Sequence, residues 1–164
     1  MTSILLYINI LGIYHWFPKM YAMIAMCYLL DFLPLLFAFP CYEFYDYYIN
    51  EVIHKEIVDE LRVEFPSTKI FTIPTGWATK NLAQMNLDDE LLDDISMVGP
   101  KSSSIFTDEK GHQGQIVIET GTMIWLNSIY NVDLSSFNYD TGFTTDLHAI
   151  AQDIIDSHDS NYEQ

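Results

Sequence analysis

Between residues 43 and 65, hydrophobic positions recur at steps of three and four, and charged residues fill the positions between them. This spacing places the apolar side chains along one face and predicts a long amphipathic helix. Glu51 and Lys55 stand four residues apart within it, a spacing that adds a favourable ion pair on the exposed side. The helix is expected to end at residues 66–68, because this group begins with a proline.

The next two segments carry different patterns. Residues 69–73 are rich in β-branched and aromatic side chains, which favours a short strand. A turn is expected at residues 74–76, and a short helix over residues 77–85. A helix, a strand, a turn and a second helix in this order are typical of a layered α/β fold.

Helical spacing returns twice in the last third of the chain. One helix is predicted from Gln115 to about Tyr130, with a buried side made of Ile116, Val117, Met123, Ile124, Ile129 and Tyr130. After a loop, Thr144 or Thr145 can cap a last helix. Its apolar stripe is Leu147, Ile150, Ala151, Ile154 and Ile155. Residues 99–104 are expected to form a loop.

Charge divides the chain near residue 40. Of the 7 basic and 23 acidic residues, the first forty positions contain only Lys19 and Asp31. Residues 41–164 therefore carry the whole net charge of -16. This boundary separates an apolar N-terminal segment, residues 1–40, from an acidic α/β region, residues 41–164.

The apolar segment contains twenty residues, 20–39, with a single charge, which is the length of a membrane-spanning helix. Asp31 near its centre and Pro34 argue against a span. A secretory signal fits poorly, because no basic n-region follows Met1 and no small-x-small cleavage pattern follows the apolar run. A buried strand over residues 4–13 followed by an irregular segment, and a start that is not an intact native N-terminus, are the alternatives. A membrane helix here would imply an extracytoplasmic or membrane-associated location.

The acidic composition bears on partners and cofactors. A chain with this negative charge and no basic stripe would be repelled by DNA or RNA, so nucleic-acid binding is not expected. Cys27 and Cys41 do not have the spacing of a metal site. The acidic run at residues 88–94 lacks the alternating ligands and the glycine of a calcium loop, so a solvated acidic face is expected there.

The strongest candidate for chemistry is the segment IFTDEKGHQG, residues 105–114. It places Asp108 and Glu109 four and three residues ahead of His112, directly before a predicted helix. A carboxylate that binds one imidazole nitrogen leaves the other free to act as a general base. A solvated turn beside a helix would have the same sequence, and spacing alone leaves both interpretations open.

The remaining candidates have no such partners. His54, His148 and His158 are expected at the surface, and Trp77 is expected in core or rim packing. No serine stands in a G-x-S-x-G or Gly-Asp-Ser context.

The order of KIFTIPTG, an acidic linker, IFTDEKGHQG and a helix ending in WLNSIYNVD resembles the C-terminal half of bacterial SGNH (GDSL-like) hydrolases. These are esterases and carbohydrate deacetylases with a three-layer α/β/α, flavodoxin-like fold. The resemblance implies a partial sandwich of this kind, with few strands and a helix-rich C-terminal half. By the same resemblance His112 matches the catalytic base. Glu109 has the family's usual spacing, and Asp108 is the residue type that the family prefers.

The family's Gly-Asp-Ser block and its two oxyanion-hole blocks are not recognisable in residues 1–47. The resemblance therefore implies a truncated copy that keeps only the acid/base loop, a copy whose missing half is supplied elsewhere, or an inactive copy. The expected activity is hydrolysis of a small-molecule ester or a carbohydrate O-acetyl ester by a serine mechanism, which needs no cofactor. The alternative is a non-catalytic acidic α/β module, tethered to a membrane by residues 20–39.

Overall fold

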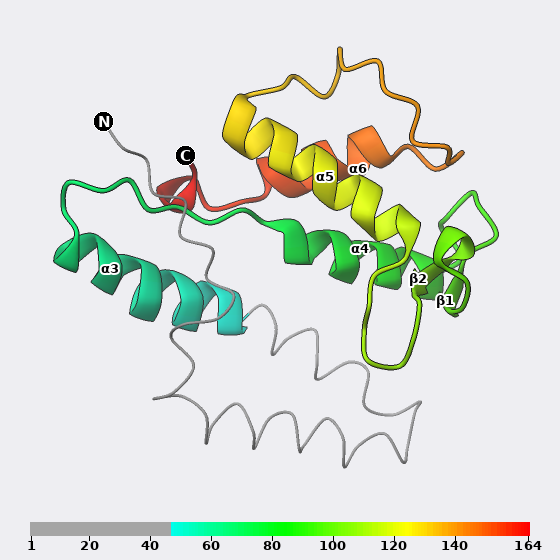
Figure 1. Ribbon diagram of the computed structural model, residues 1–164, viewed down its shortest axis with the longest axis horizontal. Coiled ribbons are helices and arrows are strands. Elements are labelled where there is room, and N and C mark those ends of the chain that lie inside the picture. The colour runs from blue at the N-terminus through cyan, green and yellow to red at the C-terminus, as the bar shows by residue number, and fades with distance from the viewer. Residues whose placement is uncertain (1–46) are drawn as a thin grey trace. The chain divides into compact units, whose positions relative to one another are not determined.

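The computed structural model describes residues 47–164 (Figure 1). The predictions for the apolar segment, which are the membrane helix over residues 20–39 and the strand over residues 4–13, lie outside the described residues. None of the helices formed by residues 47–164 is both long enough and apolar enough to cross a membrane. The chain divides into two compact units, residues 1–70 and residues 71–164, and each is considered by itself.

The described part of the first unit is the predicted amphipathic helix. It consists of a π-helix, η1 (Tyr48–Val58), continued by the α-helix α3 (Asp59–Glu64). The backbone N–H of Asp59 donates to the carbonyl of His54, five residues back, as the wider π turn requires. The helix ends before residues 66–68, as predicted.

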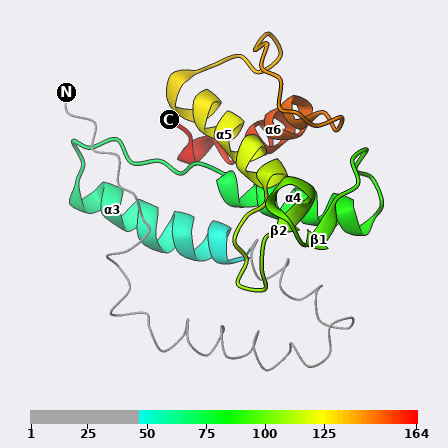
Figure 2. The same cartoon turned by 45° about the vertical axis from the view of Figure 1, so that its right-hand side comes forward.

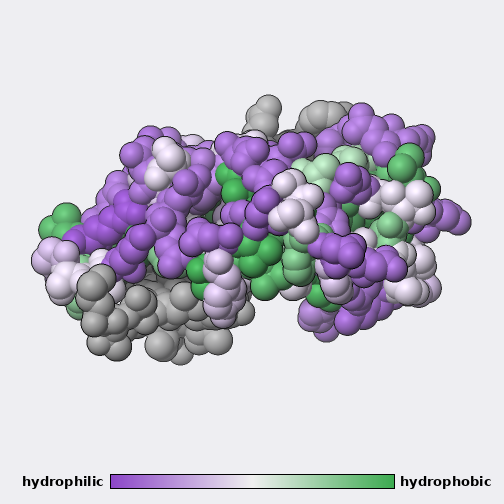
Figure 3. All heavy atoms as spheres, turned by 90° about the horizontal axis from the view of Figure 1, so that it is seen from above, coloured by the Kyte–Doolittle hydropathy of each residue, from purple (hydrophilic) through white to green (hydrophobic). Residues whose placement is uncertain are grey.

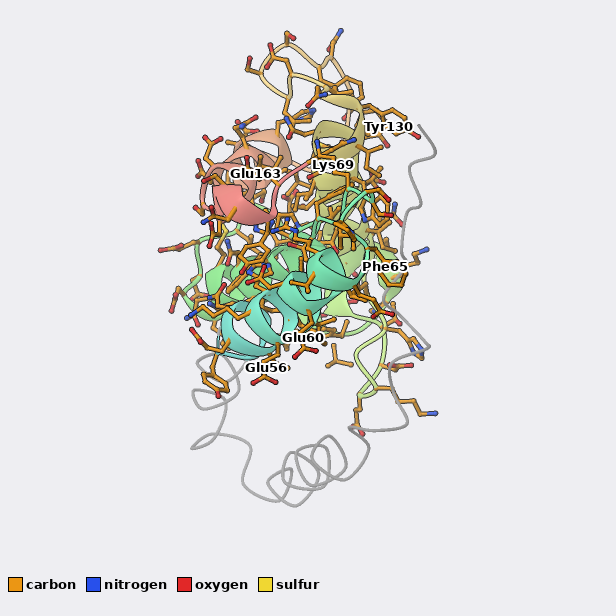
Figure 4. All side chains as sticks on the ribbon, turned by 90° about the vertical axis from the view of Figure 1, so that its left-hand side faces the viewer. Glu56, Glu60, Phe65, Lys69, Tyr130 and Glu163 are labelled. Carbon is orange, nitrogen blue, oxygen red and sulfur yellow. The ribbon has the colours of Figure 1, made fainter. Side chains whose placement is uncertain are left out.

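His54 is buried, with 2% of its surface exposed, so its predicted surface position is wrong. The π-helix turns less per residue than an α-helix, and the faces expected from a 3.6-residue period therefore shift along η1. Val52 and Val58 are buried as well. Glu56 and Glu60 are exposed (Figure 4), and Lys55 forms the predicted ion pair with Glu51 at 2.6 Å.

No strand forms over residues 69–73, which corrects the sequence prediction. The backbone there is held by other partners. Arg62 donates from Nε and Nη2 to the carbonyl of Ile70, at 3.0 and 2.8 Å, within the first unit. In the second unit, Thr72 donates its backbone N–H to the carbonyl of Tyr162. The β-branched composition thus marks a segment outside regular structure whose polar groups are satisfied without a neighbouring strand.

The second unit contains three main helices and a small sheet (Figures 1 and 2). Helix α4 (Thr75–Leu87) comes first, two residues longer at each end than predicted. Strands β1 (Ser96–Val98) and β2 (Ser104–Phe106) follow, separated by the short helix η2 (Lys101–Ser103). Next come α5 (Gln115–Tyr130), α6 (Leu147–Asp156) and the short helix η3 (Ser160–Tyr162).

The two strands are parallel, with Ser96 paired with Ser104 and Val98 with Phe106. The loop predicted over residues 99–104 contains the short helix η2 and ends at Ser104, the first residue of β2. Three-residue strands are too short to show a two-residue period, and serine and glycine surround them. The described chain is therefore a mixed α/β structure, as expected, and its one sheet has two strands.

Helix α5 packs against α6, α4 and β2 and supplies much of the core of the second unit. Ile116, Val117, Met123 and Ile124 are buried as predicted. The elements that α5 contacts also supply buried residues to the core: Leu82, Ile105, Leu147, Ala151 and Ile154. Tyr130 is 71% exposed, so its predicted burial is wrong. It is the last residue of α5 (Figure 4), and the helix is closed by Asn131, whose φ of 54° is left-handed.

The acidic run after α4 contains a structural anchor. Most of residues 88–94 are exposed, as expected, but Asp93 is half-buried. Its carboxylate accepts hydrogen bonds from the backbone N–H groups of Thr144 and Thr145, at 2.9 and 2.8 Å, and from the Thr145 hydroxyl at 2.6 Å. The Thr145 hydroxyl accepts in turn from the N–H of Leu92. This Asp93 anchor joins two segments some fifty residues apart.

The anchor explains why neither predicted threonine caps α6. Thr145 is buried and its hydroxyl is already bonded to Asp93. Asp146 takes the cap position, and its side chain accepts from the N–H of Ala149 at 3.0 Å.

Hydrophilic residues cover much of the described surface on one face of the protein (Figure 3), in keeping with its negative charge.

Gly114 lies against the backbone of β2, and a larger residue has no room there. A Cβ atom at this position would lie 1.7 Å from the carbonyl oxygen of Ser104. We expect Gly114→Ala to lower the free energy of unfolding by at least about 3 kcal/mol, because the backbone of β2 would have to move. Gly121→Ala is the control, since its Cβ meets nothing within 4 Å. In mid-helix it should stabilise by up to about 1 kcal/mol. Urea unfolding measures the stability of both variants. An unfolding midpoint for Gly114→Ala equal to that of the wild type would contradict the close contact.

The Asp93 anchor makes stability depend on pH. Partial burial by itself raises the pKa of Asp93, but the hydrogen bonds from Thr145 and Thr144 outweigh it and lower that pKa below 3.8. The ionised carboxylate therefore stabilises the fold above pH 3.8, and the contribution is lost as pH falls through the lowered pKa. Asp93→Asn should cost about 1–2 kcal/mol at neutral pH and much less in acid. Thermal unfolding of the wild type and Asp93→Asn, at neutral pH and in acid, checks this. Asp94→Asn, an exposed neighbour with the same charge change, should cost little.

Candidate active site

The candidate catalytic loop, residues 107–113, connects β2 to α5 and is closed at its base by backbone hydrogen bonds. Phe106 and Gln113 form an antiparallel bridge. The N–H of Gly114 donates to the carbonyl of Ile105, and the N–H of Thr107 donates to the carbonyl of His112, both at 2.7 Å. Two short antiparallel segments therefore fix where the loop leaves the sheet and where it enters the helix.

Asp108 organises the tip of this loop. Its Oδ1 accepts from the backbone N–H groups of Lys110 at 2.9 Å and His112 at 3.3 Å. Such a side-chain turn is a common role of aspartate, whose short carboxylate reaches the N–H two residues on. Gly111 has a φ of 82°, a left-handed backbone that suits glycine, and its side-chain position is open. These two residues bring the chain around so that position 112 faces position 108.

The second oxygen of Asp108, Oδ2, lies 2.5 Å from Nδ1 of His112. An ionised carboxylate can only accept, so Nδ1 carries the proton and Nε2 of a neutral imidazole is left as the acceptor. This is the tautomer and the orientation that a general base requires. The side chains of His112 and Asp108 are 69% and 42% exposed, so the pair faces solvent.

The pair also affects the pKa of Asp108. The hydrogen bond from the His112 side chain is the largest influence and holds the pKa of Asp108 below 3.8. Slight desolvation opposes this, and the backbone N–H groups of His112 and Lys110 add to the lowering. Asp108 is therefore ionised at neutral pH, as a partner for Nδ1 must be.

Glu109 is exposed and makes no hydrogen bond or ion pair with the residues that the structure describes. Of the two carboxylates that spacing left open, Asp108 is the one brought to His112. The sequence could not decide between them, because the choice depends on the turn that Asp108 itself forms.

Gln113 fastens the loop to a neighbouring helix. Its Nε2 donates to Oγ1 of Thr79 on α4, at 3.1 Å. His112 thus lies between an aspartate on one side and an anchored residue on the other. Within residues 47–164, Nε2 of His112 has no hydrogen-bond partner, and no serine is brought to it.

The other histidines differ from their predicted surface positions. His158 is half-buried, and its Nε2 lies 3.1 Å from the hydroxyl of Thr72. His148 is half-buried beside the ring of Phe137, and its buried Nε2 has no partner among the described residues.

Trp77 is half-buried, with Nζ of Lys80 4.3 Å from its ring centre. No group of three metal-ligating side chains occurs within residues 47–164.

Comparison with known proteins yields no relative: no protein-family model, no curated protein and no solved structure matches the chain. The resemblance to SGNH hydrolases therefore depends on the sequence motifs alone.

Proposed function

We propose that the loop at residues 107–113 is the acid–base part of an SGNH-like serine hydrolase that cleaves esters, including O-acetyl esters of carbohydrates. The observation that carries the proposal is the 2.5 Å hydrogen bond between Asp108 Oδ2 and His112 Nδ1, with Nε2 left open to solvent. The hydrogen bond fixes the tautomer of His112, and the solvent-facing Nε2 is accessible to a substrate.

The proposed chemistry assigns one role to each residue. Nε2 of His112 takes the proton from a serine hydroxyl as its oxygen bonds to the ester carbonyl carbon. The protonated imidazole, stabilised by Asp108, then gives that proton to the departing alcohol oxygen as the ester bond breaks. Water repeats the two proton transfers and releases the acid from the serine. The protein needs no cofactor for these steps.

The nucleophile has to come from outside residues 47–164, because no hydroxyl there is hydrogen-bonded to Nε2 of His112. Ser3 is the only serine in the first 46 residues of the sequence. We propose that either this part of the chain or a second polypeptide completes the site. The three-layer α/β/α sandwich belongs to the same proposal. In the complete fold, further parallel strands would extend the pair β1–β2, and helices would cover both faces of the sheet, as is normal for parallel sheets.

A serine-directed fluorophosphonate and p-nitrophenyl acetate together test the activity. The wild-type chain should be labelled on a serine and should hydrolyse the ester, and His112→Ala should lose both. Asp108→Asn should lower the rate by about four orders of magnitude, because the histidine loses its orienting partner. Glu109→Gln is the matched control and should keep the wild-type rate. Background hydrolysis and no labelling in the wild type would show that this chain does not supply its own nucleophile and would favour a non-catalytic acidic module.

A second measurement tests the Asp108–His112 pair without depending on activity. We expect the pKa of Asp108, followed by carbon NMR of its carboxyl group, to lie below 3.8 and to rise toward that value in His112→Ala. In the wild type, ionised Asp108 then stabilises the loop above pH 3.8, and this contribution disappears as pH falls through the lowered pKa. Lys110→Gln keeps its backbone N–H and should leave the pKa nearly unchanged. An unshifted Asp108 in the wild type would refute the pairing itself.

A further inference from the structure

An open pocket of about 440 Å³ lies where the last turns of α5 and α6 meet two other segments of the second unit. Asn127 and Asn131 line it from the end of α5, and Asp156 from the end of α6. Thr72 lines it from the segment before α4, and Glu163 from the segment after η3. Its volume is within the range of small-molecule sites in proteins.

This polar pocket is separate from the Asp108–His112 pair. His112 precedes the first residue of α5, Gln115, whereas the pocket lies at the opposite end of the same helix. Sixteen helical residues at about 1.5 Å each put roughly 20 Å between them. The pocket therefore cannot hold the group that His112 would act on, and its own lining determines which ligand it can bind.

The lining excludes two classes of ligand. Only Pro74 and Ile155 among its ten residues are apolar, so a hydrophobic molecule would leave many polar groups unpaired. Asp156 and Glu163 bring two carboxylates to the lining, and no lysine or arginine lines it, so the pocket is electronegative. A phosphate or a carboxylate would be repelled.

Donors accompany these acceptors, and this distinguishes a hydroxylated ligand from a simple cation. Asn131 and Ser128 add an amide and a hydroxyl group to the lining, whereas the hydroxyl of Thr72 already has a partner in Nε2 of His158, at 3.1 Å. An ammonium ion could bind the carboxylates but would leave the donors without acceptors. A hydroxyl group both donates and accepts, so a molecule with several hydroxyl groups satisfies both kinds of wall group.

His158 matches an uncharged ligand. Burial lowers its pKa below 6.5, and the nearby carboxylate of Glu163 opposes this only in part. At neutral pH the imidazole is therefore mostly neutral, with one nitrogen that donates and one that accepts. It adds no positive charge that would attract an anion.

We propose that this pocket binds a neutral polyhydroxylated molecule of the size of a mono- or disaccharide. The inference does not depend on the proposed hydrolase activity, because it uses none of the residues of the catalytic loop. If both hold, the sugar is bound about a helix length away from the ester that is cleaved, as an extended carbohydrate would allow.

Amide NMR of the full-length chain, titrated with D-glucose, D-xylose and maltose, tests the proposal. At least one sugar should cause saturable shifts centred on Thr72, residues 127–131 and residues 155–158. Glucose 6-phosphate should bind more weakly than glucose, because of Asp156 and Glu163. Tetramethylammonium should cause smaller shifts than the sugar.

Two variants of α6 provide the comparison. Asp156→Asn should weaken sugar binding about tenfold, since a hydrogen bond to a charged acceptor is replaced by one to a neutral amide. Asp153→Asn, an exposed aspartate on the same helix that does not line the pocket, should bind like the wild type. Superimposable spectra of the free variants establish that both are folded. The proposal is wrong if no sugar shifts these resonances, if the shifts centre on residues 105–114, or if Asp156→Asn binds as tightly as Asp153→Asn.

Discussion

The close backbone contact between Gly114 and strand β2 is the constraint on which the candidate active site depends. The N–H of Gly114 binds the carbonyl of Ile105 while its missing side chain leaves room for the carbonyl of Ser104. The same contact fixes both the start of α5 and the base of the loop before it. Because α5 packs on α4, α6 and β2, its position sets the core of the second unit as well. Loop geometry and core packing therefore share one origin.

The chain's negative charge has a local structural use beyond solubility. In several turns an aspartate accepts the N–H two or three residues ahead, which shapes the loop without any contact from elsewhere. These residues are Asp108, Asp133, Asp140, Asp146 and Asp159. Asp93 does the same across fifty residues of sequence. Much of the loop structure after β2 thus depends on hydrogen bonds to aspartate side chains, although a composition count registers these residues only as surface charge.

Helix positions could be predicted from the sequence, but the small sheet could not. The bounds of α5 follow from a glycine before it and an asparagine after it, two residues with clear conformational preferences. Strands β1 and β2 have three residues each, too few to show a period. The composition of residues 69–73 favoured a strand, yet their carbonyl and N–H groups bind Arg62 and Tyr162. Local sequence describes the preferred backbone conformation and not the partner that satisfies it.

The same distinction applies to the sites. Spacing identified His112 and two possible carboxylates, and only the turn formed by Asp108 decides between them. The polar pocket had no sequence signal, because its wall comes from four separate segments whose residues are unremarkable one at a time. His54 was misplaced for a different reason, since a π-helix does not follow the spacing from which its face was predicted.

The length of α5 has a consequence for how this protein can tolerate insertions and deletions. The helix starts at a glycine held against the sheet and ends at a left-handed asparagine. Adding or removing one residue between them would rotate everything beyond that point by about 100°. Either the side chains of Ile116 and Val117 or those of Met123 and Ile124 would then leave the core and face solvent. Sixteen residues is therefore a fixed register between the catalytic loop and the polar pocket, and length variation should be confined to the loops on either side.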